Sequence, residues 1–586
     1  MKKITLSKIV AGLAIAAISI STAFAQTNLG SECGCPVLSA RGTAINLSSL
    51  PGMTTGDLGT SGGKYAELGV NTTLTCDKMY TIDRKIYIGN GVTLTIMPGT
   101  VIKGGPADLG LPQNAAALIV ERGAKLIADG TEACQIVFTG VNDPMDGTYS
   151  MTNVGDWGGI VLLGTSPNNL TTANASSAGA NGVGFIEGFN AANAFDKYGA
   201  GDAAFPTANP ADNSGILRYV SIRHAGAVIS NGNELNGLSL GSVGSGTTIE
   251  HLETIAAADD NIEFFGGTVN VKYCSVLFGD DDFYDWDLGW SGKGQFLFGL
   301  AGDSITGLHT TDNGFEADAD DNSKSPVLRS HPVIYNATFI GNGHINPSAD
   351  NTGPAAIQAK ELTEGEIYNS VFANFRSGLH LATARSNATN LGDAYDNWTN
   401  QTTPYNNGGT GVARKNSLIV KNNTFINFPV TTKTGAADSI RTGPLTKGAL
   451  FIGKNPAKFR YATACDAIDN AQFITTDGNN VVASVPGFDY NWGWNAAHTS
   501  YASNSFHATP TSNIASSIAP TADGFFSVVN YRGAFDANKS SWINDWALGQ
   551  VLTSQQSNPT DLNNDGITNT NDFLILVGKF GLPNSK

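Results

Sequence analysis

The segment DNIEFF at residues 260–265 returns as DFYDWD at residues 282–287 and again as NGFEAD at residues 313–318. Equivalent positions in the first two copies are 22 residues apart, and the third copy follows after a further 31 residues. The first interval fits one coil of a parallel β-helix, and the second fits a coil that carries an inserted loop. The repeat therefore predicts a solenoid in which successive coils stack equivalent residues on one another.

The rest of the chain supports an all-β fold. Long helical patterns are nearly absent, and short β-rich runs such as VTLTI (92–96) and IVLL (160–163) are each closed within a few residues by Gly, Asn or Asp. Regular strands with turn signals are compatible with a sandwich, a propeller or a solenoid. The spacing of the sequence repeat favours the solenoid, a parallel β-helix, and the 69 glycines suit its tight turns.

Several longer stretches resemble a known group of proteins. NGVTLTIMPGTVIKG (90–104), GDWGGIVLLG (155–164) and YRGAFDANKSSWINDW (531–546) are similar to segments of secreted right-handed parallel β-helix proteins of Bacteroidetes type, which have the pectin-lyase-like fold. The resemblance covers roughly residues 75–550 and implies the fold without a particular reaction. It also implies that residues 531–546 are the final coil and its cap.

The first 25 residues have the pattern of a signal peptide. Lys2, Lys3 and Lys8 precede an apolar stretch, and Ala23-Phe24-Ala25 forms a cleavage site. No other stretch is long and apolar enough to be a transmembrane segment. We therefore expect a secreted, extracellular or outer-surface protein. Its expected organisation is a signal peptide (1–25), an N-terminal segment or cap (26–74), the β-helix (75–550) and a C-terminal repeat (556–586).

Charge and cysteine content limit the partners. The formal net charge is −16 at pH 7, which argues against nucleic acid and anionic membranes and suits a partner that brings cations. An exported protein can oxidise its cysteines, but six cysteines allow fifteen pairings, and the sequence does not choose among them.

Residues 561–572, DLNNDGITNTND, have the ligand spacing of a twelve-residue calcium loop. Gly566 supplies the turn, and an apolar helical face is expected after the loop. The segment resembles one repeat of a type I dockerin, a family in which the repeat occurs twice. This resemblance implies calcium as cofactor and a cell-surface or cohesin-like protein as partner. The expected ligands are Asp561, Asn563, Asp565, the carbonyl of Ile567, Asn569 and Asp572.

The three aligned copies also predict a ladder of carboxylates. Alternation along a strand directs Phe264, Trp286 and Ala317 inward, so their neighbours face outward on coils about 4.8 Å apart. Bare carboxylates at that spacing repel one another, and a divalent cation or nearby base would relieve this. The candidate bases are Lys293, His309, Arg329 and His331. The candidate metal or glycan residues are Asp260, Glu263, Asp282, Asp285, Asp287, Glu316 and Asp318.

Three functions are compatible with this acidic face. The acidic face is a calcium-dependent surface that binds polysaccharide or mediates adhesion, the site of a polysaccharide lyase or glycoside hydrolase, or a solvated face of a scaffold without a ligand. Clustered carboxylates serve calcium binding and acid–base catalysis alike. The first function is our working hypothesis, and the sequence assigns no catalytic residue.

Overall fold

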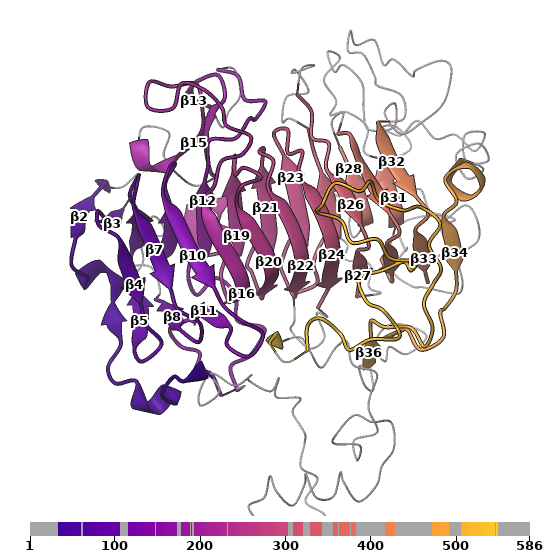
Figure 1. Ribbon diagram of the computed structural model, residues 1–586, viewed down its shortest axis with the longest axis horizontal. Helices are drawn as coiled ribbons and strands as arrows, with labels where there is room; N and C mark the ends of the chain where they lie inside the picture. Colours follow the sequence, from indigo (N-terminus) through magenta and orange to yellow (C-terminus); the bar gives the residue numbers. More distant parts are fainter. Residues whose placement is uncertain are drawn as a thin grey trace, which may run out of the picture.

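In the part of the chain that the computed structural model describes, the regular elements of the protein are mostly β-strands, arranged along one long axis (Figure 1). Most of the described strands belong to two sheets, sheet A with 18 strands and sheet B with 11. The structure describes residues 33–59, 63–105, 115–146, 148–172, 177–187, 189, 193–230, 233–302, 309–319, 328–342, 355–360, 363–375, 377–381, 417–427, 472–491, 505–544 and 546–548.

The bounds of the elements are as follows. Sheet A contains β1 (Ile45–Asn46), β4 (Thr72–Leu74), β5 (Met79–Ile82), β7 (Thr93–Ile96), β8 (Val101–Gly104), β10 (Lys125–Asp129), β11 (Ile136–Gly140), β16 (Gly215–Arg223), β20 (Thr248–Ile255), β22 (Asn270–Leu277), β24 (Lys293–Leu300), β26 (Val333–Tyr335), β27 (Thr338–Ile340), β29 (Gly365–Tyr368), β30 (Val371–Ala373), β32 (Leu418–Lys421), β33 (Thr424–Ile426) and β34 (Asn480–Val482). Sheet B contains β2 (Met53–Asp57), β3 (Lys64–Leu68), β6 (Lys85–Ile88), β9 (Ala117–Val120), β12 (Ile160–Leu163), β19 (Leu238–Gly241), β21 (Ile262–Phe265), β23 (Tyr284–Asp287), β25 (Phe315–Ala317), β28 (Ala355–Ala359) and β31 (Ser377–Leu381). The smaller elements are β13 (Ser177–Ala180), β14 (Val183–Phe185), β15 (Lys197–Gly199), β17 (Val228–Ser230), β18 (Asn233–Glu234), β35 (Asp489–Asn491), β36 (Ser505–His507), the 3-10 helices η2 (Leu38–Ala40), η3 (Leu47–Ser49) and η6 (Ala194–Asp196), and the π-helix η7 (Gln472–Thr476).

The chain alternates between the two sheets, and each coil adds one strand to sheet B and either one long strand or two short strands to sheet A. From β19 to β25 it passes from sheet B to sheet A and back three times, and each strand pairs in parallel with its equivalent in the next coil. Figure 1 shows the strands of successive coils side by side along the long axis. Parallel pairing of this kind, repeated from β4 to β34, confirms the predicted parallel β-helix.

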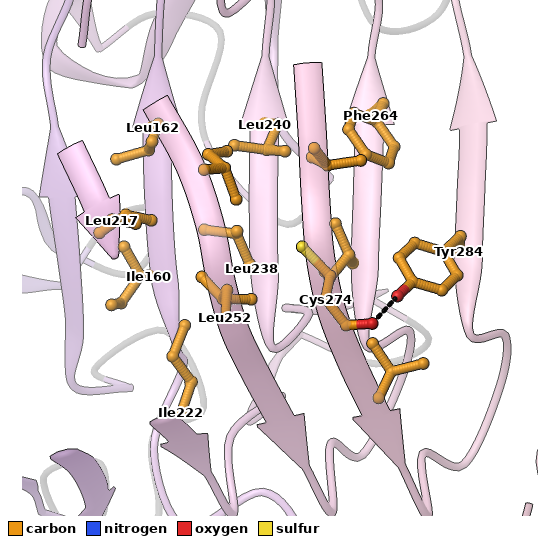
Figure 2. Packing of buried hydrophobic residues seen from close by; sticks show 14 of the residues in the cluster. Ile160, Leu162, Leu217, Ile222, Leu238, Leu240, Leu252, Phe264, Cys274 and Tyr284 are labelled. Atoms are coloured by element: carbon orange, nitrogen blue, oxygen red, sulfur yellow. Dashed lines mark hydrogen bonds between the residues drawn. The ribbon is translucent and has the colours of Figure 1, made fainter. Parts of the chain in front are cut away.

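The interior is built from ladders of apolar side chains in register. Leu162, Leu240, Phe264 and Trp286 occupy equivalent positions in β12, β19, β21 and β23, and each is at most 1% exposed. Figure 2 shows the labelled members of this cluster between the two sheets. Burying one such side chain contributes roughly 1.5–3 kcal/mol. The inward stack predicted for Phe264 and Trp286 is therefore confirmed.

Each long strand of sheet A bends at one residue in the left-handed region. The bends in β16, β20, β22 and β24 fall at Tyr219, His251, Tyr273 and Phe296, whose φ angles are 48°, 52°, 55° and 55°. This conformation costs roughly 1–2 kcal/mol for an ordinary residue. Stacking offsets part of that cost, because the ring centroids of successive bend residues lie 4.5, 4.6 and 4.9 Å apart. The next three coils carry asparagine, which tolerates this conformation, at Asn336, Asn369 and Asn422.

Residues 514–544 and 546–548, here called the strap, run back along the outside of sheet A. The strap contacts β24 through Gln295, whose Nε2 donates to Ser527 O at 2.8 Å, and reaches β20, where the Leu548 N–H donates to Glu253 Oε2 at 2.9 Å. Asn336 and Asn369 at the bends donate to Tyr531 O at 2.8 Å and to Ile518 O at 2.6 Å. The expectation that residues 531–546 form the final coil and cap is wrong, because their described part lies across earlier coils instead of continuing the solenoid.

A lobe formed by residues 165–172, 177–187, 189 and 193–205 covers the outer face of sheet B at the N-terminal coils. It contains the small antiparallel sheet of β13, β14 and β15. Its Leu170, Ile186 and Tyr198 pack on outward apolar residues of sheet B such as Val161 and Leu163. The lobe thus buries the apolar half of this outer face and leaves the acidic half, on β21, β23 and β25, beside it.

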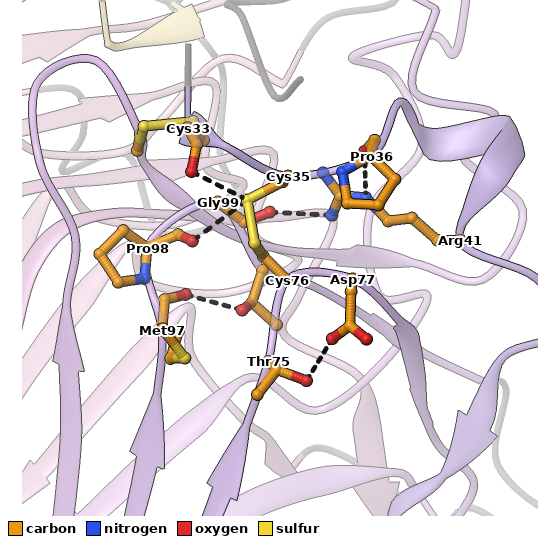
Figure 3. The surroundings of a disulfide bond; sticks show 12 residues. Cys33, Cys35, Pro36, Arg41, Thr75, Cys76, Asp77, Met97, Pro98 and Gly99 are labelled. Carbon is orange, nitrogen blue, oxygen red and sulfur yellow. Dashed lines mark hydrogen bonds between the residues drawn. A yellow bond between two sulfur atoms is a disulfide. The ribbon is translucent and has the colours of Figure 1, made fainter. Parts of the chain in front are cut away.

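Two disulfides fasten the beginning of the described chain to the first coils (Figure 3). Cys35 is bonded to Cys76 and Cys33 to Cys134, while Cys274 is a buried free thiol. Gly99, from the coil between the two bonded ones, lies beneath this junction, and a Cβ there would approach Cys35 Sγ to 2.8 Å. The structure thus selects a pairing that the sequence left open. Each bridge closes a long loop, which destabilises the unfolded chain.

His251 should make folding stability depend on pH. Its ring is stacked between Tyr219 and Tyr273, and burial, with Arg218 and Lys272 nearby, lowers its pKa from 6.5 to about 4. Between these values the unfolded chain binds a proton that the folded chain does not, so this contribution to stability is lost as the pH falls from 6.5 towards 4. The full difference is roughly 3 kcal/mol.

His251→Phe keeps an aromatic ring in the stack and removes the titration. Urea unfolding between pH 4 and pH 7 should show that the wild-type chain loses stability towards acid by more than the variant does. If the free energy of unfolding decreased equally towards acid in the two chains, His251 would not be the group that causes this pH dependence.

The strap should stabilise the coils it crosses. Trp546 is completely buried, and its ring lies against Tyr219 and His251 with centroid distances of 5.6 and 6.1 Å. Trp546→Ala should lower the free energy of unfolding by about 3–5 kcal/mol, measured by urea denaturation. Val528→Ala is the matched control, because Val528 lies on the same strap but is 67% exposed. A loss no larger than that of the control would show that the strap does not stabilise the fold.

Candidate cation site

The acidic face lies on three successive strands of sheet B. Glu263 of β21 is the register partner of Asp285 of β23, which in turn pairs with Glu316 of β25. Their sequence neighbours Phe264 and Trp286 point into the core, so the carboxylates point outward. Parallel pairing places these outward groups about 4.8 Å apart from coil to coil. The structure thus brings together the side chains that the repeat singled out.

A second ladder runs along the turns that enter these strands. Each turn side chain accepts the backbone N–H of the equivalent residue one coil later. Asp260 Oδ1 accepts from Asp282 N at 2.8 Å, and Asp282 Oδ1 accepts from Asn313 N at 2.5 Å. Asn236 and Asn313 continue the ladder at its two ends. This explains why the repeated segments begin with Asp or Asn: one oxygen of each side chain holds neighbouring coils together.

Three carboxylates converge where the two ladders meet. One oxygen from each of Asp260, Glu263 and Asp285 lies within 4.8 Å of the other two, and the same holds for Asp259, Asp260 and Asp281. Asp285 Oδ1 is buried and has no hydrogen-bond partner among the described residues. Glu263 Oε2 accepts one hydrogen bond, from Asn236 Nδ2 at 2.5 Å. Carboxylate oxygens at this spacing are the ligands that calcium takes, at 2.3–2.6 Å from the ion.

Burial and mutual repulsion raise the pKa values of these carboxylates. Burial, and then Asp259 and Asp285 beside it, raise the pKa of Asp260 well above its usual range. The pKa values of Glu263 and Asp285 are raised in the same way, by burial first and neighbouring carboxylates second. Burial also raises the pKa of Asp259 to about 7. A divalent cation at this place would supply the positive charge that the protons otherwise supply.

Several rim residues come from segments that the sequence did not connect to the face. Glu187 of the lobe and Glu234 of β18 lie close enough to raise the pKa of Asp259, and Asp312 does the same for Asp281. Asp287, two residues after Asp285, accepts the backbone N–H of Leu288 at 2.5 Å and contributes to the raised pKa of Glu263. No sequence pattern links Glu187 or Glu234 to the repeat, since each reaches the face through a separate insertion.

The positive charge inside the ladder comes from Lys360, which the sequence analysis missed. Its ammonium forms an ion pair with Glu316 and lies 3.8 Å from Asp318 Oδ2. Lys360 follows β28, where Gln358 is the register partner of Glu316. The segment AAIQAK (355–360) is thus a further copy of the repeat. It is hidden because Gln358 stands where the other copies have a carboxylate, and Lys360 stands where two of them have one.

The four bases expected near the face are mostly elsewhere. His309 does reach its rim, where Nδ1 lies 2.7 Å from Asp280 Oδ1. Lys293 pairs with Asp523 of the strap. Arg329 and His331 both contact Glu364, at 3.2 and 3.1 Å. Lys293 begins β24 of sheet A, and Arg329 and His331 precede β26 of the same sheet, so none of the three lies on a strand of sheet B.

The C-terminal calcium loop lies outside the described residues. Its expected ligands Asp561, Asn563, Asp565, Ile567, Asn569 and Asp572, and the signal peptide at residues 1–25, therefore remain predictions from the sequence. The described part of the chain contains no helix that is both long and apolar enough to span a membrane.

Comparison with known families agrees with this architecture. Residues 63–448 match the family described as a pectate-lyase like beta helix domain. No curated protein and no solved structure matches the chain. Since the match spans more than half of the sequence, the chain belongs to this β-helix family.

Calcium should stabilise the folded protein more at higher pH. A carboxyl group whose pKa is raised on folding favours the folded state at low pH, and this contribution is lost as the pH rises through the raised pKa. Calcium replaces the protons, so the increase in melting temperature on adding calcium should grow between pH 5 and pH 8.

The matched comparison uses Glu263→Gln with Asp285→Asn, which removes two charges and keeps the side-chain volume. In this variant, differential scanning fluorimetry should show a smaller calcium-dependent shift at every pH. An equal shift in both chains would place the calcium elsewhere.

Proposed function

We propose that the protein is a secreted or surface-associated β-helix protein that binds acidic polysaccharide through a calcium ion on its acidic outer face. The observation that carries the proposal is the convergence of Asp260, Glu263 and Asp285, with a buried Asp285 oxygen that lacks a hydrogen-bond partner among the described residues. A divalent ion held by three carboxylates keeps open coordination positions for carboxylate and hydroxyl oxygens of a glycan. The family description itself points to polysaccharide.

Two further features support export. Cys33, Cys35, Cys76 and Cys134 form two disulfides, which are typical of proteins that fold outside the cytosol. The N-terminal 25 residues have the pattern of a signal peptide. The C-terminal calcium repeat would then attach the protein to the cell surface or to a cohesin-like protein.

Cleavage of the polysaccharide is the alternative, and Lys360 is the observation that favours it. A lysine within reach of clustered carboxylates is a candidate general base. However, Glu316 and Asp318 raise the pKa of Lys360 well above its usual range, although its burial acts in the opposite direction. A base must be deprotonated at the working pH, so this ammonium is better suited to holding charge than to accepting a proton. Binding is therefore the function that the geometry supports best.

Affinity electrophoresis tests the proposal. The protein should be retarded by polygalacturonate or alginate with calcium present, and released by a chelator. Dextran, which is uncharged, should not retard it. Glu263→Gln with Asp285→Asn should abolish the retardation.

The control is Asp57→Asn with Glu132→Gln, which removes two charges from exposed sites away from the face. Retardation that is the same with and without calcium would contradict the proposal, and so would retardation that decreases equally in both double variants. The same incubations report on the alternative, because accumulation of unsaturated products or reducing ends would show cleavage.

A further inference from the structure

The acidic face divides into two halves that differ in how their charge is compensated. In the first half, Asp260, Glu263 and Asp285 converge. Of these three carboxylates, Asp285 is the one on which Lys360 also acts electrostatically. In the second half, Glu316 and Asp318 share the Lys360 ammonium. Asp285 stands between the halves, since it is the register partner of both Glu263 and Glu316.

The second half contains its own cation. Glu316 uses one oxygen for Lys360 and the other to accept a hydrogen bond from Gln358 Nε2 at 2.5 Å. Gln358 Oε1 lies 2.9 Å from His380 Nδ1, which extends the polar row to β31. The side chain of Lys360 is 25% exposed and those of Glu316 and Asp318 are each 17% exposed, so water screens this cluster only in part.

The backbone fixes the position of the ammonium. The Lys360 N–H donates to Ala317 O at 2.8 Å, as the Asp318 N–H donates to Trp286 O one coil earlier. Lys360 is therefore the equivalent, one coil later, of Asp318, and Asp318 is the equivalent of Asp287. Where the repeat would place another outward carboxylate, the chain places a cation, and that cation turns back onto the two acids of the preceding coil.

We propose that Lys360 is the protein's own counter-ion, occupying the place that a second divalent cation would take between Asp285, Glu316 and Asp318. The acidic face then takes up one ion, at the convergence of Asp260, Glu263 and Asp285. This inference rests on the proposed function for the position of the first ion. It adds that Lys360 sets the stoichiometry and excludes a continuous row of ions along the face.

Calorimetric titration of the full chain with calcium tests the inference. Lys360→Gln keeps a polar side chain of similar length but removes the charge, and should take up one more calcium ion per chain than the wild type. Lys360→Arg keeps the charge and should match the wild type. Any ion bound by the C-terminal loop is common to all variants and cancels in the comparison.

A second pair of measurements distinguishes a new calcium site in Lys360→Gln from a general loss of stability. Lys360→Gln should melt at a lower temperature than the wild type in a chelator, and calcium should restore more of its stability than it adds to the wild type. Glu316→Gln with Lys360→Gln removes both members of the ion pair. It should fold without calcium and return to the wild-type stoichiometry, because too few charged ligands remain.

Equal calcium uptake by the wild type and Lys360→Gln would overturn the inference. A Lys360→Gln chain that does not fold even with calcium would overturn it too, since the ion should replace the ammonium. Glu263→Gln separates this result from the proposed function. If that variant binds as much calcium as the wild type, the first site is refuted, whereas a gain in Lys360→Gln would still establish the role of Lys360.

Discussion

Parallel pairing in register between successive coils is the constraint on which the rest of this structure depends. Because each coil must satisfy its backbone groups on the next, equivalent residues are held about 4.8 Å apart whatever their chemistry. For inward positions this spacing is favourable, and it produces the buried ladder through Leu240, Phe264 and Trp286. For outward acidic positions the same spacing forces like charges together, as at Glu263, Asp285 and Glu316.

The apolar surface and the negative charge on the outer faces of the two sheets are dealt with in different ways. Apolar outer surface is covered by segments that are not coils: the lobe packs on sheet B and the strap packs on sheet A. The acidic part of sheet B has the Lys360 ammonium on one side. On the other side, burial and neighbouring carboxylates raise the pKa values of Glu263 and Asp285. Asp260 and Asp282 serve two purposes, since one oxygen of each joins neighbouring coils and the carboxylates as a group create the charge that a cation would relieve.

Much of the coil architecture could be predicted because a repeat is a local signal. The 22-residue spacing and the alternation around Phe264 and Trp286 were sufficient to place Glu263 and Asp285 on one outward face. Lys360 was missed because its copy of the repeat has Gln and Lys in place of carboxylates. Glu187 and Glu234 were missed because separate insertions bring them to the face. The strap was misassigned as a cap for a related reason: its Trp546 and Arg532 bind coils far away in the sequence, and no periodicity records such contacts.

The sequence by itself determined that the chain forms a parallel β-helix. It also determined which residues of the repeated strands point inward or outward. Both could be predicted because the coil period and the alternation along a strand depend on residues close together in the sequence. The tertiary structure alone decided the pairing of Cys33 with Cys134 and Cys35 with Cys76, the course of the strap, and the division of the acidic face by Lys360. These features depend on contacts between segments that are far apart in the sequence. Their distance in space is set by the three-dimensional fold, and separation along the sequence does not determine it.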